Sequence, residues 1–122
     1  MFDLIFYRDG NDNSPIAEYL LKLSKSAQTS KSERIKLKKI TQYLELLGKH
    51  GVKLGEPYVK HIEGDIWELR PISDRIFFFH WQGGKLVLLH HFVKKSNKTP
   101  SKEIEQAKRN QKDFLLRSGN NE

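Results

Sequence analysis

The stretch YVKHIEGDIWELRPISDRIFFFHWQGGKLVLLHHFV, residues 58–93, decides the fold of this chain. It divides into short runs rich in aromatic, aliphatic and β-branched residues, separated by turns that contain glycine, proline or aspartate. The runs predict strands at residues 58–62, 66–70, 75–82 and 85–93. Strands that are joined by such short turns pair antiparallel, so we expect a largely antiparallel sheet.

The residues before this stretch predict one more strand and two helices. The apolar run at residues 2–7 has the length of a strand and ends in a dense turn signal. Ser14 and Pro15 form a hydroxyl cap followed by proline, a pattern typical of a helix start. Ser30 and Glu33 have the spacing of a capping box, which predicts the start of a second helix.

A third helix is predicted after the sheet. Thr99 and Pro100 repeat the pattern of a cap followed by proline, and apolar residues recur at helical spacing to about Leu116. The order β-α-α-β-β-β-β-α predicts an α+β fold, with a twisted, mainly antiparallel sheet and helices packed against it. We expect a single domain over residues 1–117, followed by a frayed tail at residues 118–122.

Positive charge is concentrated in two parts of the chain. The 122 residues include 22 lysines and arginines against 15 acids, which gives a net charge of +7. Residues 22–60 hold ten of these bases and three acids, and residues 94–117 hold eight bases and three acids. Such blocks attract polyanions such as RNA, DNA or an acidic protein, although a solvated helix face gives the same pattern.

Composition excludes several classes of protein. A hydrophobic content of 37% with seven phenylalanines is too high for a disordered chain. No apolar run approaches the roughly 18 residues of a membrane span, and the start of the chain carries acid where a signal peptide needs base. We therefore expect a cytoplasmic protein without membrane contact. The lack of cysteine excludes disulfides, a thiol nucleophile and cysteine-ligated zinc.

Alternation along the predicted strands indicates which side chains share a face of the sheet. One face of strand 85–93 is expected to hold Leu86, Leu88, His90 and Phe92, and the other Val87, Leu89, His91 and Val93. A polar set is expected at one end of the sheet, comprising Lys60, Glu68, Arg70, Arg75, Lys94 and Lys95. Arg70 and Arg75 either pair with Glu68 across strands or clamp a phosphate, which guanidinium groups bind bidentately.

The histidines give weaker signals. His90 and His91 are adjacent in a predicted strand, so they face opposite sides and cannot readily share a metal ion. His50, His61 and His80 lack the spacing of a metal site, and we expect no metal. Either His90 or His91 has the chemistry of a general acid or base, and the sequence does not choose between them.

Four motifs occur in a fixed order along the chain. They are WELR at residues 67–70, RIFFF at 75–79, FVKKSNKTP at 92–100 and EIEQA at 103–107. With the strand and two helices predicted upstream, they resemble the RelE/ParE toxin superfamily, specifically its HigB-type, phage-derived branch. The resemblance spans nearly the whole chain and implies the RelE-like fold.

The resemblance implies that the chain is the toxin of a bacterial type II toxin–antitoxin system. Such toxins are mRNA interferases that enter the ribosomal A site and cleave mRNA by attack of a ribose 2′-hydroxyl on the adjacent phosphate, without a metal or cofactor. The implied partners are the ribosome, mRNA and a helix-turn-helix antitoxin, with DNA contacted only through the antitoxin. The alternatives are a ParE-like gyrase poison and a non-enzymatic module that binds RNA or protein.

The resemblance also implies roles for individual residues. Arg75 corresponds to the superfamily's central strand arginine, which contacts the scissile phosphate. Arg70, Lys94 and Lys95 would join this clamp, and Lys60, Lys98 and Lys53 would contact RNA.

The general acid and base stay open, because members of the superfamily differ in these residues. No tyrosine follows Tyr58 in this chain, which argues against a tyrosine-dependent reaction. His90, His91, Glu68 or a lysine of lowered pKa are left for proton transfer. We include His91 and Glu68 in the predicted catalytic set.

Overall fold

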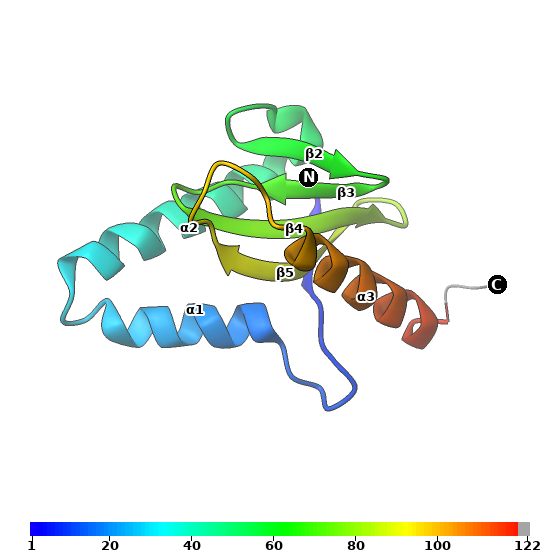
Figure 1. Ribbon diagram of the computed structural model, residues 1–122, viewed down its shortest axis with the longest axis horizontal. Coiled ribbons are helices and arrows are strands. Elements are labelled where there is room, and N and C mark those ends of the chain that lie inside the picture. Colours follow the sequence, from blue (N-terminus) through cyan, green and yellow to red (C-terminus); the bar gives the residue numbers. More distant parts are fainter. Residues whose placement is uncertain (120–122) are drawn as a thin grey trace.

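A five-stranded sheet forms the centre of the molecule, and helices cover both of its faces (Figure 1). The computed structural model describes residues 1–119. Its elements are β1 (Asp3–Phe6), α1 (Pro15–Ser26), α2 (Lys31–His50), the 3₁₀ turn η1 (Gly51–Leu54), β2 (Val59–Glu63), β3 (Ile66–Leu69), β4 (Asp74–Trp81), β5 (Lys85–Val93) and α3 (Ser101–Arg117). The predicted α+β class and element order are confirmed, while the last three residues of the predicted tail lie outside the described residues.

Two helices begin as their sequences predict. Ser14 Oγ accepts a hydrogen bond from the Ala17 N–H, and Pro15 occupies the first position of α1. Ser30 Oγ accepts a hydrogen bond from the Glu33 N–H at the start of α2. These caps satisfy N–H groups that the first helical turn leaves unpaired. Within residues 1–119, no helix has both the length and the apolar character needed to cross a membrane.

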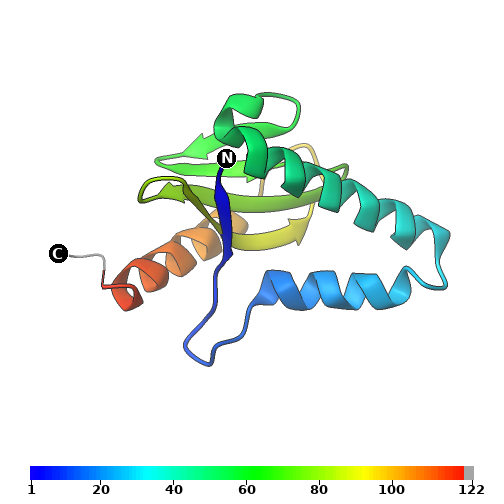
Figure 2. The same ribbon diagram turned by 180° about the vertical axis from the view of Figure 1, so that it is seen from behind.

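The sheet is mixed, with strand order β1-β5-β4-β3-β2. Strands β2 to β5 pair antiparallel with their neighbours, as the short turns predict. Strand β1 instead lies parallel to β5, with Asp3 opposite Lys85. The hairpin of α1 and α2, which connects β1 to β2 in the chain, crosses one face of the sheet. Helix α3 crosses the opposite face (Figure 2).

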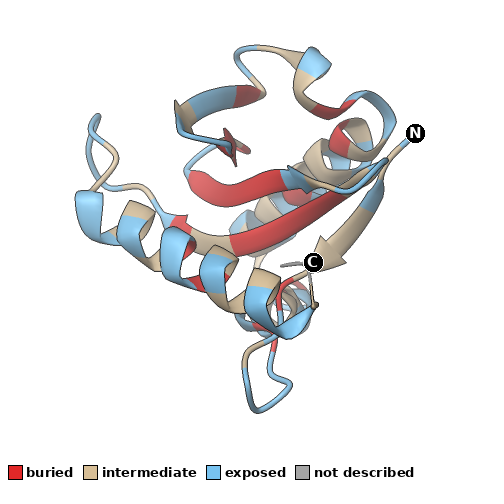
Figure 3. Cartoon of the chain, turned by 90° about the vertical axis from the view of Figure 1, so that its right-hand side faces the viewer, coloured by how far each residue is buried: buried red, intermediate tan, exposed pale blue. Residues whose placement is uncertain are grey.

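Each face of the sheet has its own hydrophobic core. The core beneath α1 and α2 includes Leu23, Ile40, Leu47, Phe78 and Leu88. The core beneath α3 includes Phe77, Phe79, Leu89, Phe92 and Ala107. Figure 3 shows that burial is concentrated in the central strands, whereas most residues of α3 are exposed or intermediate. Because both faces are covered, the central strands read as continuous apolar runs.

A β-bulge changes which side chains of β5 share a face. Phe77 of β4 pairs with His90, and its neighbour Phe78 pairs with Leu88, so β5 contains an extra residue between the two pairs. Leu88 packs towards α1 and α2, whereas Phe92 packs against Phe77 on the α3 side. The prediction that Leu88, His90 and Phe92 share a face is therefore wrong, because a bulge shifts the alternation by one residue.

Candidate functional site

Glu68 is a buried carboxylate within a cationic surface on the α3 face of the sheet. The residue is 1% exposed, and it lies opposite Lys60 of β2 and Phe77 of β4. Its Oε1 atom is 3.5 Å from Arg70 Nε and 3.8 Å from Arg75 Nε. Neither Nε atom makes a hydrogen bond within the part of the chain that the structure describes. Both Nε atoms are buried and face Glu68, so they interact with this carboxylate by charge alone.

Backbone carbonyl groups hold Arg75 in place. Its Nη1 atom donates hydrogen bonds to the carbonyl oxygens of Ile72 and Asp74, at 2.8 and 2.9 Å. The Arg75 side chain is only 9% exposed. An arginine fixed in this way can stabilise a developing negative charge without first reorganising.

The charged groups around Glu68 alter one another's pKa values. Burial raises the pKa of Glu68, and the positive charges of Arg75, Arg70, Lys94 and Lys60 oppose this rise. Burial, followed by the like charges of Arg75 and Arg70, lowers the pKa of Lys94. A carboxylate of raised pKa beside an ammonium of lowered pKa is an arrangement suited to proton transfer.

The structure brings together five of the six polar residues predicted at this end of the sheet. These are Lys60, Glu68, Arg70, Arg75 and Lys94, and we call them the cationic cluster. The sixth, Lys95, is exposed on the loop between β5 and α3, as is Lys98.

Thr99 is a neighbour of the cluster that the sequence analysis did not place there. Its hydroxyl donates to Glu68 Oε2 over 3.5 Å. The loop that carries it is tied down at its start, where the Lys94 N–H donates to the Ser73 carbonyl at 2.8 Å. Thr99 belongs to the lysine-rich motif at residues 92–100, but the only role that its sequence position predicted was that of a helix cap. The structure finds no side-chain cap hydrogen bond at the start of α3.

His91 lies away from the cationic cluster, on the face covered by α1 and α2. Its Nε2 atom is 3.5 Å from Asp74 Oδ1, and its ring stacks on Tyr19 at a centroid distance of 3.8 Å. Lys36 Nζ is 3.3 Å from the same Asp74 oxygen, and the Tyr19 hydroxyl lies 3.4 Å from both carboxylate oxygens. The predicted catalytic set requires His91 to lie near Glu68, but the structure places His91 on the other face of the sheet. We call Asp74, His91, Tyr19 and Lys36 the Asp74 cluster.

His90 lies on the same face as the cationic cluster. Its Nε2 atom is 2.6 Å from Glu103 Oε1 in the first turn of α3, and its ring packs against Phe77 and Phe92. The His90–Glu103 pair therefore bridges β5 and α3 next to the loop that carries Thr99. Glu103 belongs to the motif at residues 103–107, but its contact with His90 could not be predicted, because only the tertiary structure brings α3 against β5.

Lys53 lies at the other end of the sheet from Arg75. It lines an open pocket of about 360 Å³ together with residues that include Phe2, His80 and Leu86. His80 is near the end of β4, whereas Arg75 is near its start. The structure does not bring Lys53 to the cationic cluster.

The cationic cluster has the chemistry of a phosphodiester site. Two arginines and two lysines act on a single carboxylate, and guanidinium and ammonium groups in this number can bind a phosphate. Among residues 1–119, no three histidine or carboxylate side chains lie close enough together to hold a metal ion.

Comparison with known proteins identifies one family. Residues 18–112 match the family model described as phage-derived protein Gp49-like (DUF891). The matched region begins within α1 and ends within α3, so it includes the whole cationic cluster. No curated protein matches the chain.

Proposed function

The chain belongs to the phage-derived Gp49-like family, a family of toxin-like proteins of the RelE type, and on this premise we propose that it is a toxin that cleaves mRNA on the ribosome. It would be the toxin of a HigB-type type II toxin–antitoxin system. In this role its partners are the ribosome, mRNA and an antitoxin that holds it inactive. The proposal places its action in the cytoplasm, where translation occurs.

The observation that carries this proposal is the excess of positive charge around Glu68. One buried carboxylate would be neutralised by a single arginine, yet Arg70 and Arg75 both approach it and two lysines also act on its pKa. Cations beyond those needed for a structural ion pair cost desolvation and mutual repulsion. A dianionic phosphorane, which forms when a hydroxyl attacks a phosphodiester, would balance this charge.

The proposed reaction is a transesterification within the RNA strand. A ribose 2′-oxygen forms a bond to the adjacent phosphorus, and the bond from phosphorus to the 5′-oxygen of the next nucleotide breaks. The products are a 2′,3′-cyclic phosphate and a free 5′-hydroxyl. The 2′-hydroxyl loses a proton to a general base, and the leaving 5′-oxygen gains one from a general acid, so protons balance.

The pKa shifts favour Glu68 as the base and Lys94 as the acid. A carboxylate of raised pKa accepts a proton more readily than an ordinary glutamate, and an ammonium of lowered pKa donates one more readily than an ordinary lysine. Arg75 would stabilise the phosphorane, because its guanidinium is already fixed by two carbonyl groups. The His90–Glu103 pair is the second candidate for proton transfer on this face.

The test is primer extension on a reporter mRNA translated by purified ribosomes. Wild-type protein should produce cuts at codons that occupy the A site, and Arg75→Ala should reduce the cleavage rate by about 10²–10³, the effect of removing one fixed electrostatic donor. Arg109→Ala is the matched control, because Arg109 is an exposed arginine of α3. Circular dichroism establishes that each variant folds, and Arg70→Ala supplies a less buried second variant.

Different outcomes separate the competing functions. Intact mRNA with wild-type protein would overturn the proposal and direct the next assay to DNA supercoiling by gyrase. Cleavage of naked mRNA at the same rate would contradict the requirement for the ribosome. Cleavage by the Arg75→Ala variant at the wild-type rate would contradict a role for the cationic cluster in the reaction.

A further inference from the structure

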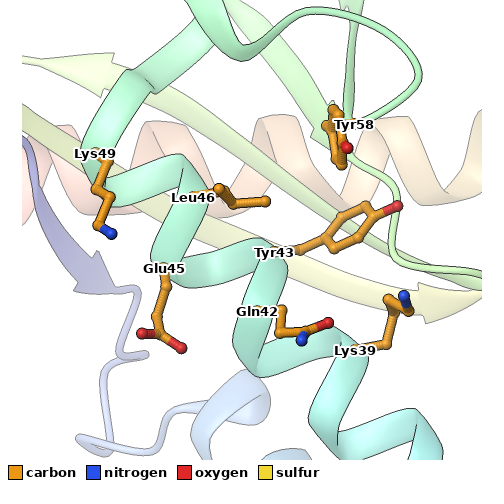
Figure 4. Close-up of a pocket in the computed structure, with 7 residues that line it drawn as sticks. All are labelled: Lys39, Gln42, Tyr43, Glu45, Leu46, Lys49 and Tyr58. Atoms are coloured by element: carbon orange, nitrogen blue, oxygen red, sulfur yellow. The ribbon is translucent and has the colours of Figure 1, made fainter.

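A groove lies between α2 and the segment that leads into β2. It has a volume of about 430 Å³ and is lined by Lys39, Gln42, Tyr43, Glu45, Leu46, Lys49 and Tyr58. Figure 4 shows Tyr43, from α2, and Tyr58, from the β2 side, next to each other in the lining of this groove. The volume lies within the range of about 300–1,000 Å³ that is typical of ligand sites.

Two tyrosine rings dominate the groove. Their centroids are 5.1 Å apart and their planes make an angle of 56°. Tyr43 also packs against the core beneath α1 and α2, which anchors its ring. Lys39, one turn earlier in α2, extends to the same side of the helix as Tyr43, whereas Glu45 points away from Tyr58 (Figure 4). The groove therefore pairs a fixed aromatic platform with a lysine.

The groove adjoins the cationic cluster around the edge of the sheet. The carbonyl of Tyr58 accepts a hydrogen bond from the Arg70 N–H at 2.9 Å. Lys60, two residues after Tyr58, lies opposite Glu68 in the ladder between β2 and β3. Because β2 is an edge strand, a flexible chain can pass from the cluster around this edge into the groove.

We propose that this tyrosine groove binds a nucleotide of the single-stranded RNA whose phosphate occupies the cationic cluster. The inference rests on the proposed function and adds a second site for the same substrate. A base stacks on Tyr58 or Tyr43, since aromatic rings accept any base face. Lys39 contacts a flanking phosphate, and it makes no ion pair with any residue from 1 to 119 in the structure.

The lining favours RNA over a peptide. An amphipathic peptide helix binds through apolar anchors in a hydrophobic groove, and Leu46 is the one aliphatic residue in this lining. Besides Lys39 and Lys49 in the lining, α2 carries exposed basic side chains at Lys31, Arg34 and Lys38. Aromatic platforms beside a basic surface are the usual arrangement for single-stranded nucleic acid.

The test uses a fluorescein-labelled, fully 2′-O-methylated RNA ten nucleotides long, which cannot undergo the proposed cleavage. Fluorescence anisotropy should show that Tyr58→Ala weakens binding about tenfold, the effect of losing one stacked base, whereas Tyr58→Phe retains it. Lys39→Glu should also weaken binding, but its matched control Lys112→Glu should not, because Lys112 is exposed on α3. A second probe with 5-iodouridine should crosslink to Tyr43 or Tyr58 under long-wavelength light.

The outcomes distinguish this inference from the proposed function. Wild-type affinity in Tyr58→Ala, or crosslinks confined to residues outside the groove, overturns the inference even if the ribosome assay shows cleavage. Loss of binding in Tyr58→Ala with rescue in Tyr58→Phe supports it even if that assay shows none. Equal loss in Lys39→Glu and Lys112→Glu means that net charge alone drives binding, and this result also overturns the inference.

Discussion

Two buried carboxylates lie at the same end of the sheet, on opposite faces, and differ in their surroundings. Asp74 is fully buried and meets one full cation, Lys36, together with a tyrosine and a histidine. Glu68 is equally buried but lies within the field of two arginines and two lysines. One lysine faces the carboxylate of the Asp74 cluster, whereas two arginines and two lysines act on the carboxylate of the cationic cluster. On the proposed function, this excess of positive charge serves to bind the phosphate of the RNA.

The partners of the two carboxylates come from different parts of the chain. Tyr19 and Lys36 belong to α1 and α2, so their contacts with Asp74 hold these helices to the sheet. Arg70, Arg75 and Lys60 come from the strands or their ends, so they gather around Glu68 without joining a helix to the sheet. We therefore expect mutations at Glu68 to affect activity and mutations at Asp74 to affect stability.

The largest effect is expected for Glu68→Gln, which keeps the shape of the side chain and removes its charge. If Glu68 is the general base, the single-turnover rate of mRNA cleavage on ribosomes should fall by about 10²–10⁴. Binding of the methylated RNA should not weaken, because the cations remain. A cleavage rate within a factor of two of wild type would instead assign the base to His90, and His90→Gln would then be the variant that loses activity.

Asp74→Asn should produce the reverse pattern. The substitution removes the counter-charge of the partly exposed Lys36 and disturbs the hydrogen bonds of a fully buried carboxylate, and we expect a loss of about 1–3 kcal/mol in the free energy of unfolding. Urea denaturation measures this loss, and Asp3→Asn is the control, because Asp3 is exposed. The cleavage rate per folded molecule should stay near wild type. A stable but inactive Asp74→Asn variant would contradict the division between the two faces.

The smallest effect is expected in the pH dependence of stability. Burial raises the pKa of Glu68 above its ordinary value of 4.5, so the folded state holds its proton to higher pH than the unfolded state does. The contribution of Glu68 to the free energy of unfolding is complete below about pH 4.5. It is lost as the pH rises through the pKa that Glu68 has in the folded state. Relative to wild type, Glu68→Gln should therefore gain stability as the pH rises from 4.5. Urea denaturation at several pH values measures this difference, and a difference that falls with pH would contradict it.

The sequence was sufficient to predict the elements and most of the cationic cluster. Local signals sufficed for the helix starts at Ser14 and Ser30, because caps involve neighbours in the chain. Alternation placed Glu68 and Arg70 on one face because β3 is short and regular. Arg75 joined them because it alternates with Phe77, which lies opposite Glu68 in a ladder without a bulge.

Residues beyond the bulge, or brought in by distant elements, could not be predicted. Strict alternation of side chains along a strand does not reveal an inserted residue, so the predicted faces of His90 and Phe92 were wrong. Glu103 and Thr99 approach the α3 face only when α3 docks. The parallel pairing of β1 with β5 likewise joins two strands that are far apart in the sequence, so no local pattern predicts it.

The pairing of β1 with β5 also has a consequence for synthesis of the chain. Asp3 is translated before every other strand of the sheet, but its ladder partner is Lys85. A strand made early must therefore stay unpaired on its β5 side until most of the polypeptide has left the ribosomal tunnel, and such distant contacts close slowly. Lys94 follows β5 directly, so a nascent chain completes its central sheet and its cationic surface at nearly the same moment.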